Sequence, residues 1–202
     1  MPQASEFVAL TPSLSFWQAY DPSVKSDLFA TAVKTDAGLF LVDPIQLEAS
    51  SLEELAGSNP VAGILVTNSN HLRATQAFAA RFRSPVFGAP VVAGELAAGS
   101  ARPIADDEEI SPGVSAIALE GAAPGEVAFH FAEDGGTMVV GDALINFEPY
   151  GFTFLPAKYC TDQKVMKRSL RRLLDWPFER LFFAHGTPIL VNARERLETL
   201  LR

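Results

Sequence analysis

The chain has 202 residues, of which 48% are hydrophobic and 20% charged, a balance that excludes intrinsic disorder. Its net charge of −8 argues against a nucleic-acid-binding surface, which needs clustered basic residues. No apolar run approaches the roughly 20 residues that cross a bilayer, and residues 1–6 lack the basic region of a secretory signal. A lone Cys160 cannot form an internal disulfide, which fits a reducing compartment. We therefore expect a single domain over residues 1–202 that is soluble and cytoplasmic, with no membrane or nucleic-acid partner.

The first half of the chain alternates strand-like and helix-like segments. Ser50 and Glu53 have the spacing of a capping box at the start of a helix, and Gly57 is a typical stop. Pro85 ends a second helical pattern that begins after Arg73. We expect strands over residues 27–34, 39–42, 63–66 and 86–87, with helices over residues 50–56 and between residues 73 and 85.

The second half continues this alternation. Thr161 is the expected cap of a helix that Pro177 terminates. His130 alternates with two phenylalanines, which favours packing or solvent exposure over a functional role. We expect strands over residues 114–119, 126–131 and 181–183, and a terminal helix from residue 191. A basic cluster on the Thr161 helix is interpreted as a solvated face; it comprises Lys164, Lys167, Arg168, Arg171 and Arg172.

Polar motifs follow several of these strands, in an order that resembles one known family. They are Asp43-Pro44, Thr67 to Arg73, Gly121 to Glu126, Gly141-Asp142 and Ala184-His185-Gly186. Together they resemble the metallo-β-lactamase superfamily, which includes the glyoxalase II-like hydrolases. The resemblance implies an α/β fold, the four-layer αββα sandwich of two mixed β-sheets with helices on both outer faces. It also implies a pocket along one edge of the sandwich.

The resemblance further implies that most metal ligands of that family are missing. The family motif Thr-His-x-His-x-Asp-His holds a zinc pair, and here Asn68 and Asn70 stand at its first two histidines. Leu72 and Arg73 stand at its aspartate and last histidine, and Ala122 replaces another histidine ligand. Leucine has no lone pair, arginine is permanently charged and neutral amides bind zinc poorly. Only Asp142 and His185 match, so no metal cofactor is expected.

The leading interpretation is a non-zinc pseudoenzyme or small-molecule-binding protein. Its pocket would take a small polar or anionic ligand, and its expected lining is Asn68, Asn70, His71, Arg73, Asp142 and His185. The alternative is a hydrolase of esters or thioesters that holds one zinc, iron or manganese ion with His71, Asp142 and His185. A third interpretation makes His185 and Asp142 a metal-free general base, near Ser69, Lys158 and Tyr159.

Two residues of the motif carry separate expectations. His71 falls at a variable position near a predicted helix start, so the sequence favours a surface or capping role over metal binding. Arg73 suggests a sharper hypothesis, in which its guanidinium enters the vacated pocket and pairs with Asp142 in place of a metal charge. The alternative for Arg73 is an exposed side chain in the first helical turn.

Overall fold

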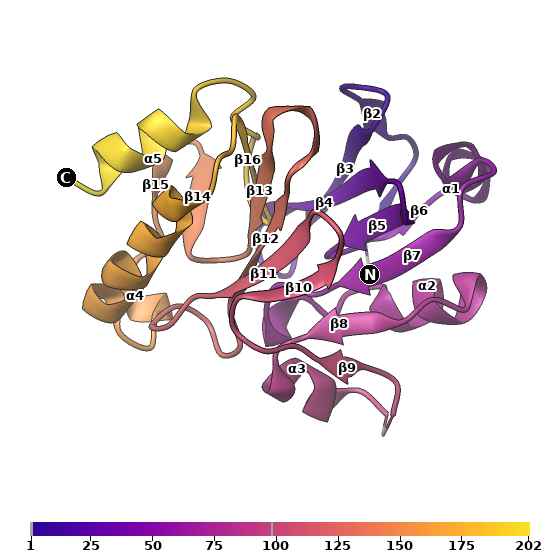
Figure 1. Cartoon of the computed structure of the whole chain (residues 1–202), viewed down its shortest axis with the longest axis horizontal. Helices are drawn as coiled ribbons and strands as arrows, with labels where there is room; N and C mark the ends of the chain where they lie inside the picture. The colour runs from indigo at the N-terminus through magenta and orange to yellow at the C-terminus, as the bar shows by residue number, and fades with distance from the viewer. Residues whose placement is uncertain (1, 98) are drawn as a thin grey trace.

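The computed structural model describes residues 2–97 and 99–202, which form two mixed β-sheets (Figure 1). The larger sheet has the order β2-β3-β4-β5-β7-β8-β9 and the smaller has the order β10-β11-β12-β13-β16. Two short pairs, β1-β6 and β14-β15, complete the strands. The strands are β1 (Gln3–Ala4), β2 (Val8–Ala9), β3 (Leu14–Asp21), β4 (Ser26–Thr35), β5 (Gly38–Val42), β6 (Gln46–Leu47), β7 (Val61–Leu65), β8 (Val86–Gly88), β9 (Arg102–Pro103), β10 (Glu108–Ser111), β11 (Val114–Ala118), β12 (Val127–Phe131), β13 (Thr137–Val140), β14 (Leu144–Phe147), β15 (Gly151–Phe154) and β16 (Arg180–Phe183).

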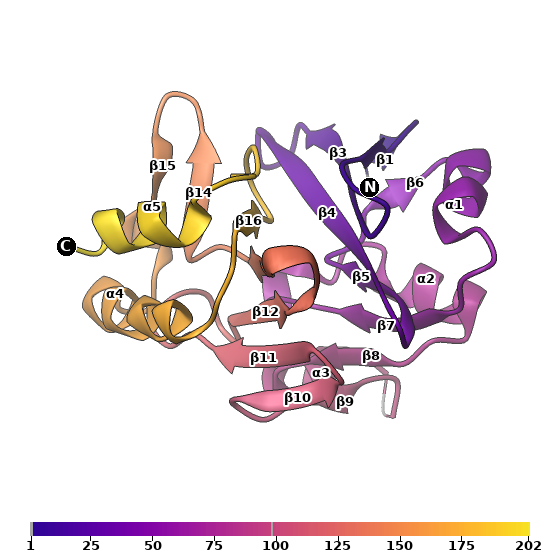
Figure 2. The same ribbon diagram turned by 45° about the horizontal axis from the view of Figure 1, so that its top comes forward.

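Helices cover both outer faces of the paired sheets (Figure 2). The α-helices are α1 (Ala49–Ala56), α2 (Thr75–Phe82), α3 (Pro90–Glu95), α4 (Gln163–Leu170) and α5 (Ala193–Leu200). Short 3₁₀ turns are η1 (Ser69–His71), η2 (Glu133–Gly135), η3 (Ala157–Tyr159) and η4 (Arg171–Asp175). Helix α2 contacts β7 of the larger sheet, and α5 contacts β16 of the smaller. The expected four-layer αββα arrangement is therefore confirmed. No described helix is both long and apolar enough to span a membrane.

The alternation of side chains in the smaller sheet separates two hydrophobic cores. Phe129 and Phe182 point into the core shared with the larger sheet, whereas Ala128 and Phe183 belong to the core beneath α4 and α5. Trp17 is 1% exposed, and its indole N–H donates to the Ile45 carbonyl. The two cores hold the strand ends that carry the polar motifs in fixed positions.

Two expected helix caps are wrong. Helix α1 begins after Glu48 with no side-chain cap, so Ser50 already lies inside the helix. Helix α4 is capped by Asp162, whose carboxylate accepts from the amides of Lys164 and Val165, rather than by Thr161. Aspartate and threonine both suit this role, and their adjacency in sequence makes the choice ambiguous. The predicted stop at Gly57 is confirmed, because its amide bonds to the carbonyl of Glu53.

The third histidine, His130, serves packing, as expected. Its side chain is 2% exposed, and Nε2 lies 2.7 Å from the Pro177 carbonyl. The ring also packs against Trp176, with the ring centroids 5.0 Å apart. His130 is thus held on the face of the smaller sheet that the α4–η4–α5 layer covers.

Candidate functional site

The polar motifs meet where two pairs of parallel strands end. Strands β5 and β7 are parallel neighbours in the larger sheet, and β13 and β16 are parallel neighbours in the smaller. Asp43 follows β5, the Thr67–Arg73 segment follows β7, Asp142 follows β13 and His185 follows β16. Because parallel neighbours end at the same edge, all four segments converge on one edge of the sandwich.

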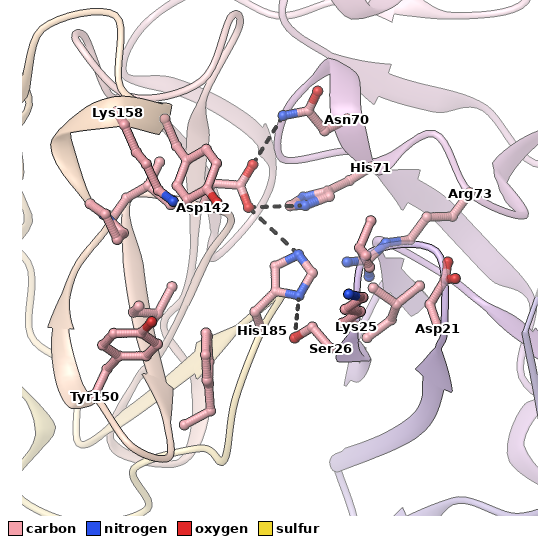
Figure 3. Close-up of a pocket in the computed structure, with 17 residues that line it drawn as sticks. Asp21, Lys25, Ser26, Asn70, His71, Arg73, Asp142, Tyr150, Lys158 and His185 are labelled. Atoms are coloured by element: carbon pink, nitrogen blue, oxygen red, sulfur yellow. Dashed lines mark hydrogen bonds and ion pairs between the residues drawn. The ribbon is translucent and has the colours of Figure 1, made fainter.

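The carboxylate of Asp142 lies at the centre of this edge (Figure 3). Its Oδ2 accepts hydrogen bonds from the side-chain amides of Asn68 at 3.2 Å and Asn70 at 3.1 Å. Its Oδ1 faces two histidines, with Nε2 of His71 at 3.3 Å and Nε2 of His185 at 3.6 Å. The two amides therefore hold Asp142 so that a single oxygen points at the histidine pair.

His71 is oriented by residues behind its ring. Its Nδ1 lies 2.8 Å from the Thr67 hydroxyl and 3.1 Å from Oδ2 of Asp43. The Thr67 hydroxyl donates to that same Oδ2, so its oxygen is free to accept, and Nδ1 of His71 carries the proton. The surface or capping role predicted for His71 is wrong, since the residue is 2% exposed. The 3₁₀ turn η1, rather than an α-helix, turns its ring inward.

His185 is oriented in the same way. Its Nδ1 lies 3.2 Å from the backbone carbonyl of Asp27 and 3.5 Å from the hydroxyl of Ser26. A carbonyl can only accept, so Nδ1 donates and Nε2 is left with its lone pair towards Asp142. Burial, reinforced by the positive charges of His71 and Arg73, lowers the pKa of His185 to about 4. The ring is therefore neutral at pH 7.

When Nε2 of His71 carries no proton, three electron-pair donors converge on one point of the site. Nε2 of His71 has no hydrogen-bond partner among the described residues and lies 3.3 Å from Oδ1 of Asp142. The lone pair of His185 faces the same carboxylate oxygen. One ligand atom from each of His71, Asp142 and His185 lies within 4.8 Å of the other two. Metal–ligand bonds of about 2.0–2.1 Å at tetrahedral angles separate ligand atoms by about 3.3–3.4 Å, close to the two distances observed. The donor set fits one metal ion.

Charges around His71 favour its protonation when no metal is bound. Burial and the Arg73 charge lower the pKa of His71, but Asp142 and Asp43 outweigh them and raise it to about 9. Burial acts to raise the pKa of Asp142, yet the charge of His71 holds it well below its usual range. The pair is therefore an imidazolium and a carboxylate at neutral pH. The carboxylates around His71 therefore favour a positive charge beside Oδ1 of Asp142, supplied either by a proton on His71 or by a metal ion.

A second buried carboxyl, that of Glu126, lies behind Asp142. Asn68 donates through Nδ2 to Oε2 of Glu126 at 2.6 Å, and the Ala143 amide donates to Oε1 at 3.0 Å. Burial and the charge of Asp142 raise the pKa of Glu126 to about 8, so it is protonated at neutral pH. Gly141 permits this cluster, because a Cβ there would lie 2.8 Å from Oε1 of Glu126. The sequence places Glu126 at the end of a polar motif and at the start of a strand, but it does not predict these contacts with Asn68 and Asp142.

Arg73 enters the site, but its expected pairing with Asp142 is wrong. The guanidinium donates to the carbonyls of Phe29 at 2.6 Å, Asp43 at 3.1 Å and Ala184 at 3.3 Å. His71 occupies the position beside Asp142 that the hypothesis gave to Arg73. The guanidinium has five N–H donors in one plane, so it can bond to carbonyls of both sheets at the same time. Arg73 therefore connects the two sheets at the base of the site.

A cavity of about 930 Å³ opens from these residues towards solvent. Five of the six expected pocket residues line it: Asn70, His71, Arg73, Asp142 and His185. Asn68 instead lies fully buried between Asp142 and Glu126. Lys158 and Tyr159, expected near the site, also belong to the lining. Leu72 and Ala122, which replace family ligands, pack into the two hydrophobic cores.

Changing Asn68 to aspartate should destabilise the protein by about 2–3 kcal/mol at pH 7.5. The substitution keeps the shape but replaces two donated hydrogen bonds with a third carboxyl facing Glu126 and Asp142. Asn70→Asp is the matched control, since exposed Asn70 contacts the same carboxylate and should lose less than about 1 kcal/mol. Urea unfolding of both variants measures the difference. Equal losses would show that Asn68 is not the critical spacer between the two carboxyls.

Comparison with known proteins agrees with this architecture. The sequence profile of the metallo-β-lactamase superfamily matches residues 9–202, and the chain therefore belongs to that superfamily. The chain matches no curated protein sequence.

Solved structures resemble the fold at low sequence identity. A metallo-β-lactamase from Pontibacter korlensis aligns with a TM-score of 0.73 and 15% identity, covering 97% of this chain and 98% of its own. A metallo-β-lactamase family protein from Thermus thermophilus aligns with a TM-score of 0.64 and 21% identity. The alignment covers 96% of this chain and 79% of that protein. An archaeal metallo-β-lactamase superfamily protein from Sulfolobus tokodaii aligns with a TM-score of 0.67 and 13% identity. The alignment covers 86% of this chain and 78% of that protein. At these identities the likeness concerns the fold, and function has to be argued from the site.

Proposed function

We propose that the protein is a hydrolase of esters, thioesters or related bonds that uses one metal ion held by His71, Asp142 and His185. The observation that carries the proposal is the convergence of two histidine Nε2 atoms on one oxygen of Asp142. Two histidines and one carboxylate form a ligand set suited to zinc, iron or manganese. The sequence favours a metal-free protein because only two ligands match the family motif. The buried position of His71 supplies the third.

The groups behind the ligands support this interpretation. Metal-binding histidines generally donate their other ring N–H to a carboxylate or a backbone carbonyl. His71 has Asp43 and Thr67 in that role, and His185 has the Asp27 carbonyl. When bound, a metal ion of this kind lowers the pKa of a bound water and polarises the carbonyl under attack. The chain contributes fixed ligand orientation, because each of the three side chains is held from the side away from the cavity.

A metal-free binding protein is the second candidate. Its specific support is the raised pKa of His71, since a proton on that ring already supplies a positive charge beside Asp142. In this state the cavity would bind a small anion without cleaving it. The two candidates differ in one property, namely whether the purified protein retains metal.

Metal content tests the proposal directly. Protein from cells supplied with zinc, iron and manganese should contain about one equivalent of one metal by elemental analysis. His71→Ala, Asp142→Ala and His185→Ala should each weaken metal binding by at least about 100-fold, more than is typical for residues behind the ligands. His130→Gln removes a histidine held elsewhere and should keep the metal. The metal-loaded protein should hydrolyse members of an ester and thioester panel. Folded protein with far less than one equivalent would favour the metal-free candidate.

A further inference from the structure

The cavity beside the proposed metal site combines an apolar wall with two lysines. Its volume of about 930 Å³ is at the upper end of the range for drug-sized ligands, well above what acetate or phosphate would fill. We propose that it takes an organic anion with an aromatic or similarly flat apolar body. This inference rests on the proposed function for the reaction, although binding itself needs no metal.

The apolar wall comes from the β14–β15 hairpin and η3. It comprises Ile145, Phe147, Tyr150, Leu155, Pro156 and Tyr159. Tyr150 and Tyr159 are each 61% exposed, so both rings are open to a ligand that enters the cavity. Tyr150 already packs edge-to-face with Phe147, with the ring centroids 5.7 Å apart. An aromatic ring of a ligand can extend this arrangement, because tyrosine offers wide contact area at low entropic cost.

The positive charges face the same space from two sides. Lys158 lies on the η3 side, and Lys25 comes from the turn between β3 and β4, next to Ser26 (Figure 3). These are two of only five lysines in a chain of net charge −8. Lys158 is held with Nζ 4.5 Å above the ring of Tyr159, so its charge lies beside the apolar wall. Neither lysine has an ion pair among the described residues.

The other charged groups of the cavity are already engaged. Asp21 accepts two hydrogen bonds from Ser23, and its negative charge is offset by the positive charge of Arg73, whose guanidinium also donates to three backbone carbonyls. Asp142 faces His71 and His185. The two lysines are thus the charges left for a ligand, and they attract a negative group. A polyanion such as nucleic acid is disfavoured by the net charge of −8.

Binding of matched probes to the metal-free protein tests this inference. The probes are 2-naphthoate and its neutral counterpart 2-naphthalenemethanol, titrated by fluorescence at low salt after treatment with EDTA. We expect the acid to bind at least about tenfold more tightly than the alcohol. Lys25→Met and Lys158→Met should each weaken naphthoate binding about two- to fivefold, as for exposed charge pairs, and leave the alcohol unchanged. Lys34→Met makes the same charge change at an exposed site outside the cavity and should have no effect.

A second pair of variants tests the apolar wall. Tyr150→Ser should weaken both probes, whereas Tyr20→Ser should weaken neither, because Tyr20 is similarly exposed at 57% but does not line the cavity. The inference is overturned if acid and alcohol bind equally, if neither binds, or if Lys34→Met matters as much as the cavity variants. Because no metal is present, these outcomes are independent of whether the proposed metal site exists.

Discussion

Replacing Arg73 with alanine should lower the free energy of unfolding by about 3–5 kcal/mol. The guanidinium donates to carbonyls of Phe29 on β4, Asp43 after β5 and Ala184 after β16, so the variant leaves acceptors from both sheets without their donor. It also removes a positive charge that offsets Asp43 and Asp142. For a chain of this length, the loss corresponds to a fall in Tm of about 10 °C, measurable by calorimetry.

Two further variants distinguish the contribution of the Arg73 guanidinium from the effect of its left-handed backbone conformation. Arg73 has a left-handed φ of 37°, which strains a residue with a side chain, and Arg83 has a similar φ of 54°. Arg83 is exposed, so Arg83→Ala should cost less than about 0.5 kcal/mol. Arg73→Lys should lose most of the stability that Arg73→Ala loses, since one ammonium cannot span three carbonyls in the guanidinium plane. If Arg73→Ala lowers the free energy of unfolding no more than Arg83→Ala does, the hydrogen bonds of Arg73 to the two sheets do not stabilise the protein.

Much of the fold could be predicted because strand ends carry readable signals. Asp142 and His185 each follow a short apolar run, and a polar residue there is expected at an edge of the sheet. The parallel pairing of β13 with β16 then brings these two residues together. The four-layer arrangement is predicted by the order of the five motifs along the chain, and no single motif is specific enough to predict it.

The residues that complete the site were harder to predict for a local reason. The direction of His71 depends on a single 3₁₀ turn, and sequence periodicity does not distinguish that turn from the first turn of an α-helix. The sequence marks Asp43 as the polar end of a strand but does not identify its partner, although a carboxylate after a fully buried strand needs one. Glu126 carried a comparable signal, because it precedes the fully buried strand β12. In both cases the partner is distant in sequence, so only the fold reveals it.

Deprotonation of His71 alone should cost the metal-free protein about 3 kcal/mol of stability as the pH rises from 6.5 to 9. The pKa of His71 is raised in the folded state from 6.5 to about 9, so the folded protein binds more protons than the unfolded chain over this range. The stabilisation is complete below pH 6.5 and is lost as the pH passes through about 9. Glu126, whose pKa is raised from 4.5 to about 8, adds a further loss of the same sign, of about 2 kcal/mol between pH 6.5 and 8. Urea unfolding of EDTA-treated protein at several pH values measures the slope, which His71→Gln should reduce.

Metal binding should show the reverse dependence, because the metal competes with the proton on His71. His185 is already neutral above pH 6.5, so His71 is the ligand that has to lose a proton. Affinity should therefore rise about tenfold per pH unit, or about 100-fold between pH 6.5 and 8.5. Calorimetry in buffers of different ionisation enthalpy should detect about one released proton. An affinity that stays flat over this range would show that the metal does not use His71. A site with only Asp142 and His185 would then hold metal too weakly for a hydrolase, and the protonated His71 would be the resident cation of a binding pocket.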